Sequence, residues 1–238
     1  MIGTGTVINT GAIIAGGILG VLLKNAFPEK IQNTLIKATG VCVLFIGIGG
    51  ALQEMLFLEN GKLISQGSMM IILSFVLGSL IGEMADIERG IEQFGTWLKS
   101  KSKNEDDSQF LDGFVTTSLI VCIGAMAVVG TIQDGLMGDY SLLMAKSILD
   151  FIIVMILAAS MGKGAIFAAI PVALFQGSIT VLAVFIEPLM TVQAISNLSL
   201  TGSILIFCVG VNLIWDKTFK VANMLPTIIF AVVFAFLL

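Results

Sequence analysis

Two charged side chains, Lys146 and Asp150, interrupt an otherwise apolar stretch of this chain of 238 residues. Their separation of four residues puts both on one face of a helix, where the ammonium and the carboxylate can neutralise each other. The pair is therefore either a structural ion pair, with Lys146 extending toward the nearer end of the stretch, or a charged lining. Such a lining would bind a cation or a proton through Asp150, or an anion through Lys146.

Uncharged polar side chains also interrupt the apolar stretches. Asn9 lies about a third of the way into the first stretch, and Gln176 and Ser178 fall near the centre of another. Polar side chains in such places either coordinate a solute or ion, or hydrogen-bond a neighbouring helix, and those at the ends of stretches are often simply solvated. The candidate residues for binding a solute or ion are Asp150, Lys146, Gln176, Ser178, Asn9, Gln133, Asp134 and Asn212.

The residue types that are missing exclude several kinds of chemistry. The chain has no histidine, which rules out His-ligated metals, His proton relays and Ser-His-Asp triads. Its three cysteines lie inside apolar stretches, with no spacing typical of zinc sites or disulfides. The dipeptide Gly138-Asp139 resembles a fragment of the intramembrane aspartyl protease motif, but the second motif, a Tyr-Asp inside an apolar stretch, is missing. We expect neither an enzyme nor a bound cofactor or metal.

Composition places the chain in a membrane. The mean hydropathy is +1.04, and 12% of the residues are charged, against about 25% in soluble proteins. Apolar runs of about 20 residues recur along the sequence, the length that a helix needs to cross a bilayer core of about 30 Å. The runs are apolar all round, which favours helices over barrel strands. A net charge of −4, with the basic residues in loops, argues against nucleic acid as a partner.

The fold class that we predict is all-α, a polytopic bundle of about eight membrane spans. The fourth and fifth form a central hairpin, with Gln133 and Asp134 at its mouth. The sixth contains Pro171 and a polar triplet around Gln176, so we predict a kink or local unwinding near its centre. The predicted spans cover residues 3–23, 34–56, 67–85, 113–134, 141–161, 165–187, 198–215 and 221–238.

The basic residues predict how the chain is oriented. With eight spans, ten of the twelve Lys and Arg residues fall in the loops of one side, and the other two are Lys62 and Lys146. Basic loops stay in the cytoplasm, so we expect both termini to lie outside. The ten residues are Lys24, Lys30, Lys37, Arg89, Lys99, Lys101, Lys103, Lys163, Lys217 and Lys220.

The longest polar region follows the third span. Residues 86–98 place Ile87, Ile91, Phe94 and Leu98 on one helical face, which predicts an amphipathic helix in the cytoplasmic interface. A charged linker completes this region, residues 86–111. We treat residues 1–238 as a single transmembrane domain that contains it.

Weak internal similarity suggests inverted repeats. Sliding the sequence against itself aligns Glu54 with Asp134 at an offset of 80 and with Asp216 at an offset of 162, matching acidic span ends to one another. We therefore predict that spans 1–3 recur inverted as spans 6–8 around the central hairpin, a recurrent transporter pattern. Glycine-rich faces on the first two spans suggest a homodimer.

The sequence resembles a family of bacterial membrane proteins. The resemblance rests on the central stretch FVTTSLIVCIGAMAVVGTIQDGLMGDYSLLMAKSILD and on FQGSITVLA, GVNLI and ANMLP, and it extends to the opening GTVINTGAIIAGGILG. These residues resemble domain-of-unknown-function family 554, the YqgA/YdfK-like proteins. The resemblance implies a bacterial plasma-membrane protein of seven or eight spans, and it implies no reaction or substrate.

Two functions from different classes fit these features. The first is a transporter or channel for a small polar or ionic solute, with a mid-membrane site built from spans 1, 4, 5 and 6. The alternative is a non-transporting membrane module, such as a sensor or an assembly factor, whose polar pairs lock helices together. A closed core with Lys146 and Asp150 fully paired would favour the module, and a polar site open to water would favour transport.

Overall fold

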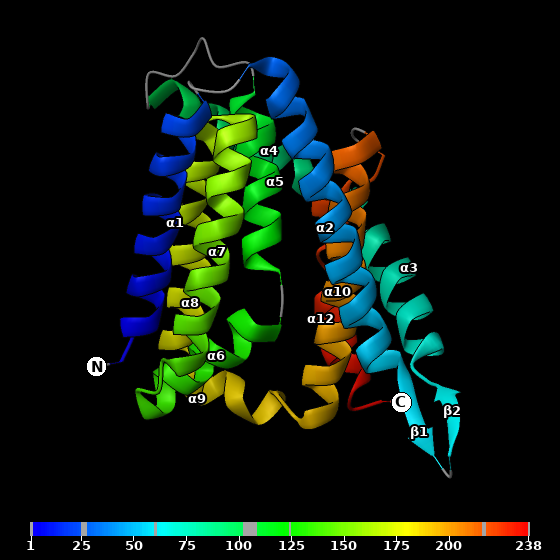
Figure 1. Ribbon diagram of the computed structural model, residues 1–238. Coiled ribbons are helices and arrows are strands. Elements are labelled where there is room, and N and C mark those ends of the chain that lie inside the picture. Colours follow the sequence, from blue (N-terminus) through cyan, green and yellow to red (C-terminus); the bar gives the residue numbers. More distant parts are fainter. Residues whose placement is uncertain are drawn as a thin grey trace. The chain divides into compact units, whose positions relative to one another are not determined.

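The computed structural model describes residues 2–24, 28–59, 61–101, 109–123, 125–215 and 218–237. It is built almost entirely of helices, with one short hairpin of strands (Figure 1). The α-helices are α1 (Thr4–Lys24), α2 (Glu29–Met55), α3 (Ser68–Ala85), α4 (Ile87–Lys101), α5 (Phe110–Cys122), α6 (Ala125–Met137), α7 (Ser141–Met161), α8 (Ala169–Val181), α9 (Ala183–Ile186), α10 (Val192–Trp215), α11 (Val221–Met224) and α12 (Thr227–Phe234). The 3-10 helices are η1 (Lys163–Ala168) and η2 (Glu187–Leu189), and β1 (Leu56–Glu59) pairs antiparallel with β2 (Lys62–Ser65).

Many of these helices have the length and composition of membrane spans. Among the described residues, six helices are long and apolar enough to cross a bilayer, or seven if α5 and α6 are counted as one bent span. Val221–Phe234 is a shorter apolar helical segment. Large apolar side chains on the outer faces are exposed, as lipid-facing residues would be, including Leu22 and Val76. The protein is thus an all-α, multi-pass membrane protein, while the count of eight spans stays a prediction.

Contacts divide the chain into two compact units. Unit 1 comprises residues 1–39 and 89–186, and unit 2 comprises residues 40–88 and 187–238. All the elements of the predicted site in spans 1, 4, 5 and 6 belong to unit 1. The predictions of a single domain and of inverted repeats stay predictions.

In unit 1, α1 and α7 lie side by side and run in the same direction (Figure 1). Small residues allow this close approach: a Cβ atom built on Gly16 would lie 2.4 Å from the Phe151 carbonyl oxygen, and one on Gly20 would lie 2.2 Å from that of Met155. Helix α8 and the preceding η1 pack antiparallel to α1, with Ile166 of η1 against Gly17. The backbones can therefore bring short polar side chains of α1, α7 and α8 within hydrogen-bonding distance.

The amphipathic helix over residues 86–98 is confirmed as α4. Leu98 is buried with Phe110 and Phe114 at the start of α5, and Ile91 packs against the same cluster. Trp97 on this helix is about half exposed. Most of the predicted charged linker, residues 102–108, lies outside the described residues.

Unit 2 packs α2, α3 and α12 around α10. Gly40, Gly47 and Gly50 of α2 lie against α10, and a Cβ atom on Gly82 of α3 would lie 1.7 Å from the Asn223 carbonyl oxygen. Met70, Leu200 and Ala231 form the buried cluster between α3, α10 and α12. Most glycines on the first two spans are thus covered by helices of the same chain, whereas Gly11 and Gly49 are open, so the homodimer stays a prediction.

Two predictions about helix continuity are wrong. Residues 113–134 do not form one helix, because α5 ends at Cys122 and α6 leaves at an angle of 62°. The sixth span is not kinked near Gln176, since α8 runs unbroken from Ala169 to Val181. Pro171 lies in the first turn of α8, directly after η1. The irregular part of this span is η1, which precedes α8. It follows Gly162, whose φ is +89°.

Candidate functional site

The end of α5 leaves polar backbone groups inside unit 1. A helix of 13 residues spans only about 20 Å, so α5 ends before it has crossed a bilayer core of about 30 Å. Its last carbonyl groups then lack helical partners. The backbone N–H of Ile123 donates to the Leu119 carbonyl, and the Lys146 ammonium donates to the Val121 carbonyl at 2.8 Å. A cation at this position also lies at the negative end of the α5 dipole.

Lys146 also pairs with Asp150 one turn further along α7. The two form a hydrogen-bonded ion pair, and their residues are only 6% and 4% exposed. The spacing predicted this pairing. Since insertion of a lone charge costs about 2.5–3.5 kcal/mol at the centre of a membrane helix, mutual neutralisation allows both groups to stay inside unit 1.

Two buried amides lie beside this ion pair. Asn9 of α1 donates through Nδ2 to Oε1 of Gln176 on α8 at 3.3 Å, and the Asn9 side chain lies next to the Asp150 carboxyl group. Both amide residues are 0% exposed. Within the described part of the chain, Asn9 Oδ1 and Gln176 Nε2 have no partner. One acceptor, on Asn9, and one donor, on Gln176, are thus left buried without a partner, a costly arrangement that a bound molecule or water would relieve.

Asp134 is buried at the start of α1 rather than solvated. Its Oδ2 accepts the Gly5 N–H at 2.9 Å, and the residue is 0% exposed. A carboxylate here satisfies one free N–H of the α1 terminus and suits the positive end of that helix. One turn from Asn9, the hydroxyls of Thr6 and Thr180 lie 3.4 Å apart. A line of polar groups therefore follows α1 from its first turn to Asp150.

The remaining predicted site residues lie elsewhere. Gln133 is half-buried on α6 next to Asp134. Ser178 is exposed, and its hydroxyl donates to the Phe175 carbonyl of its own helix. Asn212 belongs to unit 2, where its amide donates to the Phe219 carbonyl and accepts the Phe219 N–H, fixing the loop after α10. Four of the eight predicted residues are thus in mutual contact: Asn9, Lys146, Asp150 and Gln176.

Three groups of the cluster were missed by reasoning from the sequence. They are the Thr6 and Thr180 hydroxyls and the Val121 carbonyl. The threonines had a signal, because Thr6 precedes Asn9 by three residues and Thr180 follows Gln176 by four, placing each on the same helical face as its amide. The carbonyl had none, since its availability depends on the end of α5.

Exposed carboxylates in loops and at span ends have local structural roles. Asp139, in the loop before α7, accepts hydrogen bonds from the Ser141 hydroxyl and N–H, which lower the pKa of its carboxyl group. In unit 2, the hydrogen bond from Lys220 to Glu83 raises the pKa of the Lys220 ammonium. Both pairs are exposed, in contrast to the buried carboxylates of Asp134 and Asp150.

Comparison with known proteins identifies the family. Residues 4–236 match the model of a family described as DUF554, a protein family of unknown function. The chain belongs to the DUF554 family. It is 30% identical over 234 residues to "Uncharacterized membrane protein YdfK" of Bacillus subtilis (strain 168), covering 98% of this chain and 96% of YdfK.

A second relative, "Uncharacterized protein YqgA" of Escherichia coli (strain K12), is 30% identical over 231 residues, covering 95% of this chain and 94% of YqgA. No solved structure matches the chain. The DUF554 assignment confirms the resemblance seen in the sequence, and the argument about function therefore rests on the polar cluster of unit 1.

Proposed function

We propose that this DUF554 protein is a transporter or channel for a small polar or ionic solute, with its binding site in unit 1. The observation that carries the proposal is the pair of unpartnered amide atoms, Asn9 Oδ1 and Gln176 Nε2, beside the ion pair of Lys146 and Asp150. A solute that offers one donor and one acceptor would satisfy both atoms.

The break between α5 and α6 supports the proposal. Irregular backbone within a membrane is tolerated where protein or a polar cavity covers it, and transporters place solute and ion sites at such broken helices. Here the Val121 carbonyl, at the end of α5, contacts Lys146 of the same cluster. The Val121 carbonyl freed by the break is therefore next to the charged pair rather than facing lipid.

One observation favours the alternative of a non-transporting module. Lys146 and Asp150 are paired with each other and buried, as expected of a lock between helices. In the transport proposal, this arrangement is a closed form, and opening would expose the pair to solute. The two functions differ in whether the polar groups are needed for flux or only for stability.

Replacing Gln176 tests the site directly. We expect Gln176→Leu to reduce solute flux into proteoliposomes by about tenfold or more, since an interaction with the solute worth about 1.4 kcal/mol corresponds to a factor of ten. The screen would cover small ions and carboxylates. Thr131→Val is the matched control, because Thr131 is buried in the same unit but donates only within α6, to Ala127 and Val128. Equal flux in both variants would remove Gln176 from the site.

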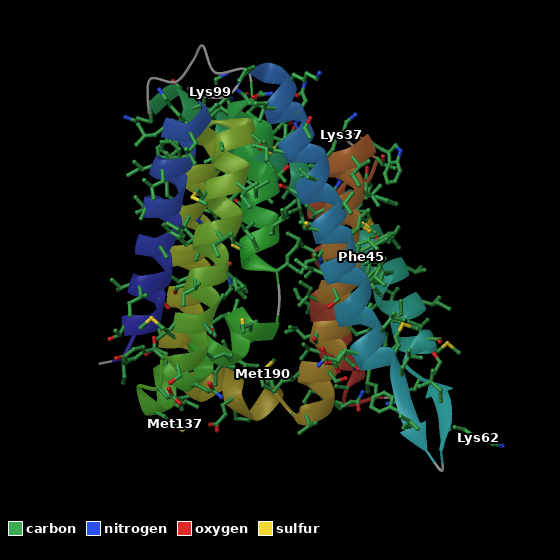
Figure 2. All side chains as sticks on the ribbon, viewed as in Figure 1. Lys37, Phe45, Lys62, Lys99, Met137 and Met190 are labelled. Atoms are coloured by element: carbon green, nitrogen blue, oxygen red, sulfur yellow. The ribbon has the colours of Figure 1, made fainter. Side chains whose placement is uncertain are left out.

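Cysteine labelling tests the proposed orientation in the plasma membrane. Lys99 and Met137 lie at opposite ends of unit 1 (Figure 2). In otherwise cysteine-free protein, we expect Met137→Cys to react with an impermeant maleimide on intact cells, because Met137 is 74% exposed on the predicted outer side. Lys99→Cys is expected to react only after permeabilisation. The reverse pattern would invert the proposed topology.

A further inference from the structure

Asp134 carries an unfilled carboxylate oxygen. Its Oδ2 accepts the Gly5 N–H, whereas its Oδ1 is buried with no hydrogen-bond partner among the described residues. A helix cap needs only one of the two oxygens, so capping of α1 explains Oδ2 and leaves Oδ1 unexplained. An ionised carboxylate that is 0% exposed normally has its charge compensated by a partner cation or by several donors.

Other oxygen atoms lie on residues next to the contact between Asp134 and Gly5. Thr6 follows Gly5 directly, and its hydroxyl lies 3.4 Å from that of Thr180. Gly135 follows Asp134, and a Cβ atom built on it would lie 2.7 Å from the Thr180 carbonyl oxygen. The first turn of α1, the second half of α6 and the end of α8 therefore meet around Asp134. Within a hydroxyl pair only one oxygen needs to donate to the other, so lone pairs remain for a ligand.

The chemistry of this group favours a cation. Carboxylate, hydroxyl and carbonyl oxygens are the ligands of hard cations, and carboxylates within membrane helices mark ion pathways. One carboxylate matches one positive charge, which favours a monovalent ion.

We propose that Asp134, Thr6 and Thr180 form a binding site for a monovalent cation of the Na⁺ class. Thr6 and Asn9 are three residues apart on α1, a rise of about 4.5 Å, so the cation site borders the amide pair. A cation would also hold the first turn of α1 against α6 through Gly5. Its role as a coupling ion rests on the proposed transport function, whereas cation binding itself does not.

Direct measurement of ²²Na⁺ binding to the purified full-length protein tests the site. We expect saturable binding at constant ionic strength that excess NaCl displaces and choline chloride does not. Asp134→Asn should abolish it. Asp139→Asn should retain it, because Asp139 lies in the nearby loop but is exposed and bonds only Ser141 among the described residues. Absence of saturable binding to the wild type, or equal loss in both variants, would overturn the proposal.

A second variant is needed if the Asp134→Asn protein unfolds because it has lost the cap of α1. Thr180→Val keeps the shape of the side chain and removes one oxygen, so we expect affinity for Na⁺ to fall by about tenfold, the effect of losing one contact to a charged group. Unchanged affinity would contradict the assigned ligand set. If solute flux does not depend on the Na⁺ concentration, Na⁺ is not a coupling ion, but the cation site is unaffected. If Na⁺ binds but no solute flux is found, the transport function is wrong and the cation site is still supported.

Discussion

Asp150→Asn will destabilise the protein by about 3–5 kcal/mol, the range for breaking a buried ion pair by removing one partner. The asparagine leaves the Lys146 ammonium buried, with the Val121 carbonyl as its remaining contact among the described residues. Lys146→Met combined with Asp150→Leu removes both charges and fills a similar volume, so we expect most of the stability to return. Unfolding of the purified variants in mild detergent measures both effects.

The control for this prediction is an exposed ion pair. Lys220 and Glu83 are paired in unit 2 with side chains that are 61% and 56% exposed. Because water solvates both groups, Lys220→Met should leave the unfolding midpoint almost unchanged. A midpoint of Asp150→Asn equal to that of the wild type would show that Lys146 finds another partner or leaves the interior.

Gly20→Leu is expected to separate α1 from α7. A Cβ atom at Gly20 would lie 2.2 Å from the Met155 carbonyl oxygen and 2.7 Å from the Ala158 Cβ, so backbone must move before any side chain fits. Overpacking typically costs about 1–3 kcal/mol, with more expected here because the clash is with backbone. Shifting α1 would also move Asn9 away from Gln176 and Asp150, so flux should fall together with stability.

Gly11→Leu is the matched control for this substitution. Gly11 lies on the same helix, and a Cβ atom there meets nothing within 4 Å. We therefore expect Gly11→Leu to keep the unfolding midpoint and flux of the wild type. Equal destabilisation by the two leucines would mean that α1 does not pack on α7 in this register.

Helix positions were predictable where the length of an apolar stretch alone determines them. The prediction of residues 141–161 matches α7, and the prediction of 67–85 agrees with α3 within one residue. The spacing of Lys146 and Asp150 predicted their pairing, because both lie within one continuous helix. Such features depend on local sequence, and a single chain contains enough information to place them.

Contacts between helices were not predictable in the same way. The break between α5 and α6 is not required by composition, since residues 113–134 are apolar and long enough for one helix. Burial of Asp134 depends on the start of α1, 129 residues away in sequence. Gln176 was identified as a candidate, but the kink expected from Pro171 is absent because that proline lies in the first turn of α8. Tertiary packing decided each of these outcomes.

Solute flux through the double variant tests the central claim most directly. Lys146→Met with Asp150→Leu should fold, and it lacks both charges of the cluster while Asn9 and Gln176 remain. The measurement is uptake of the solute found with the wild type, in proteoliposomes of equal protein content, for variants whose unfolding midpoint matches the wild type. Our account predicts that flux is lost although the fold is kept. Flux at the wild-type rate would contradict it and would make the pair a structural lock.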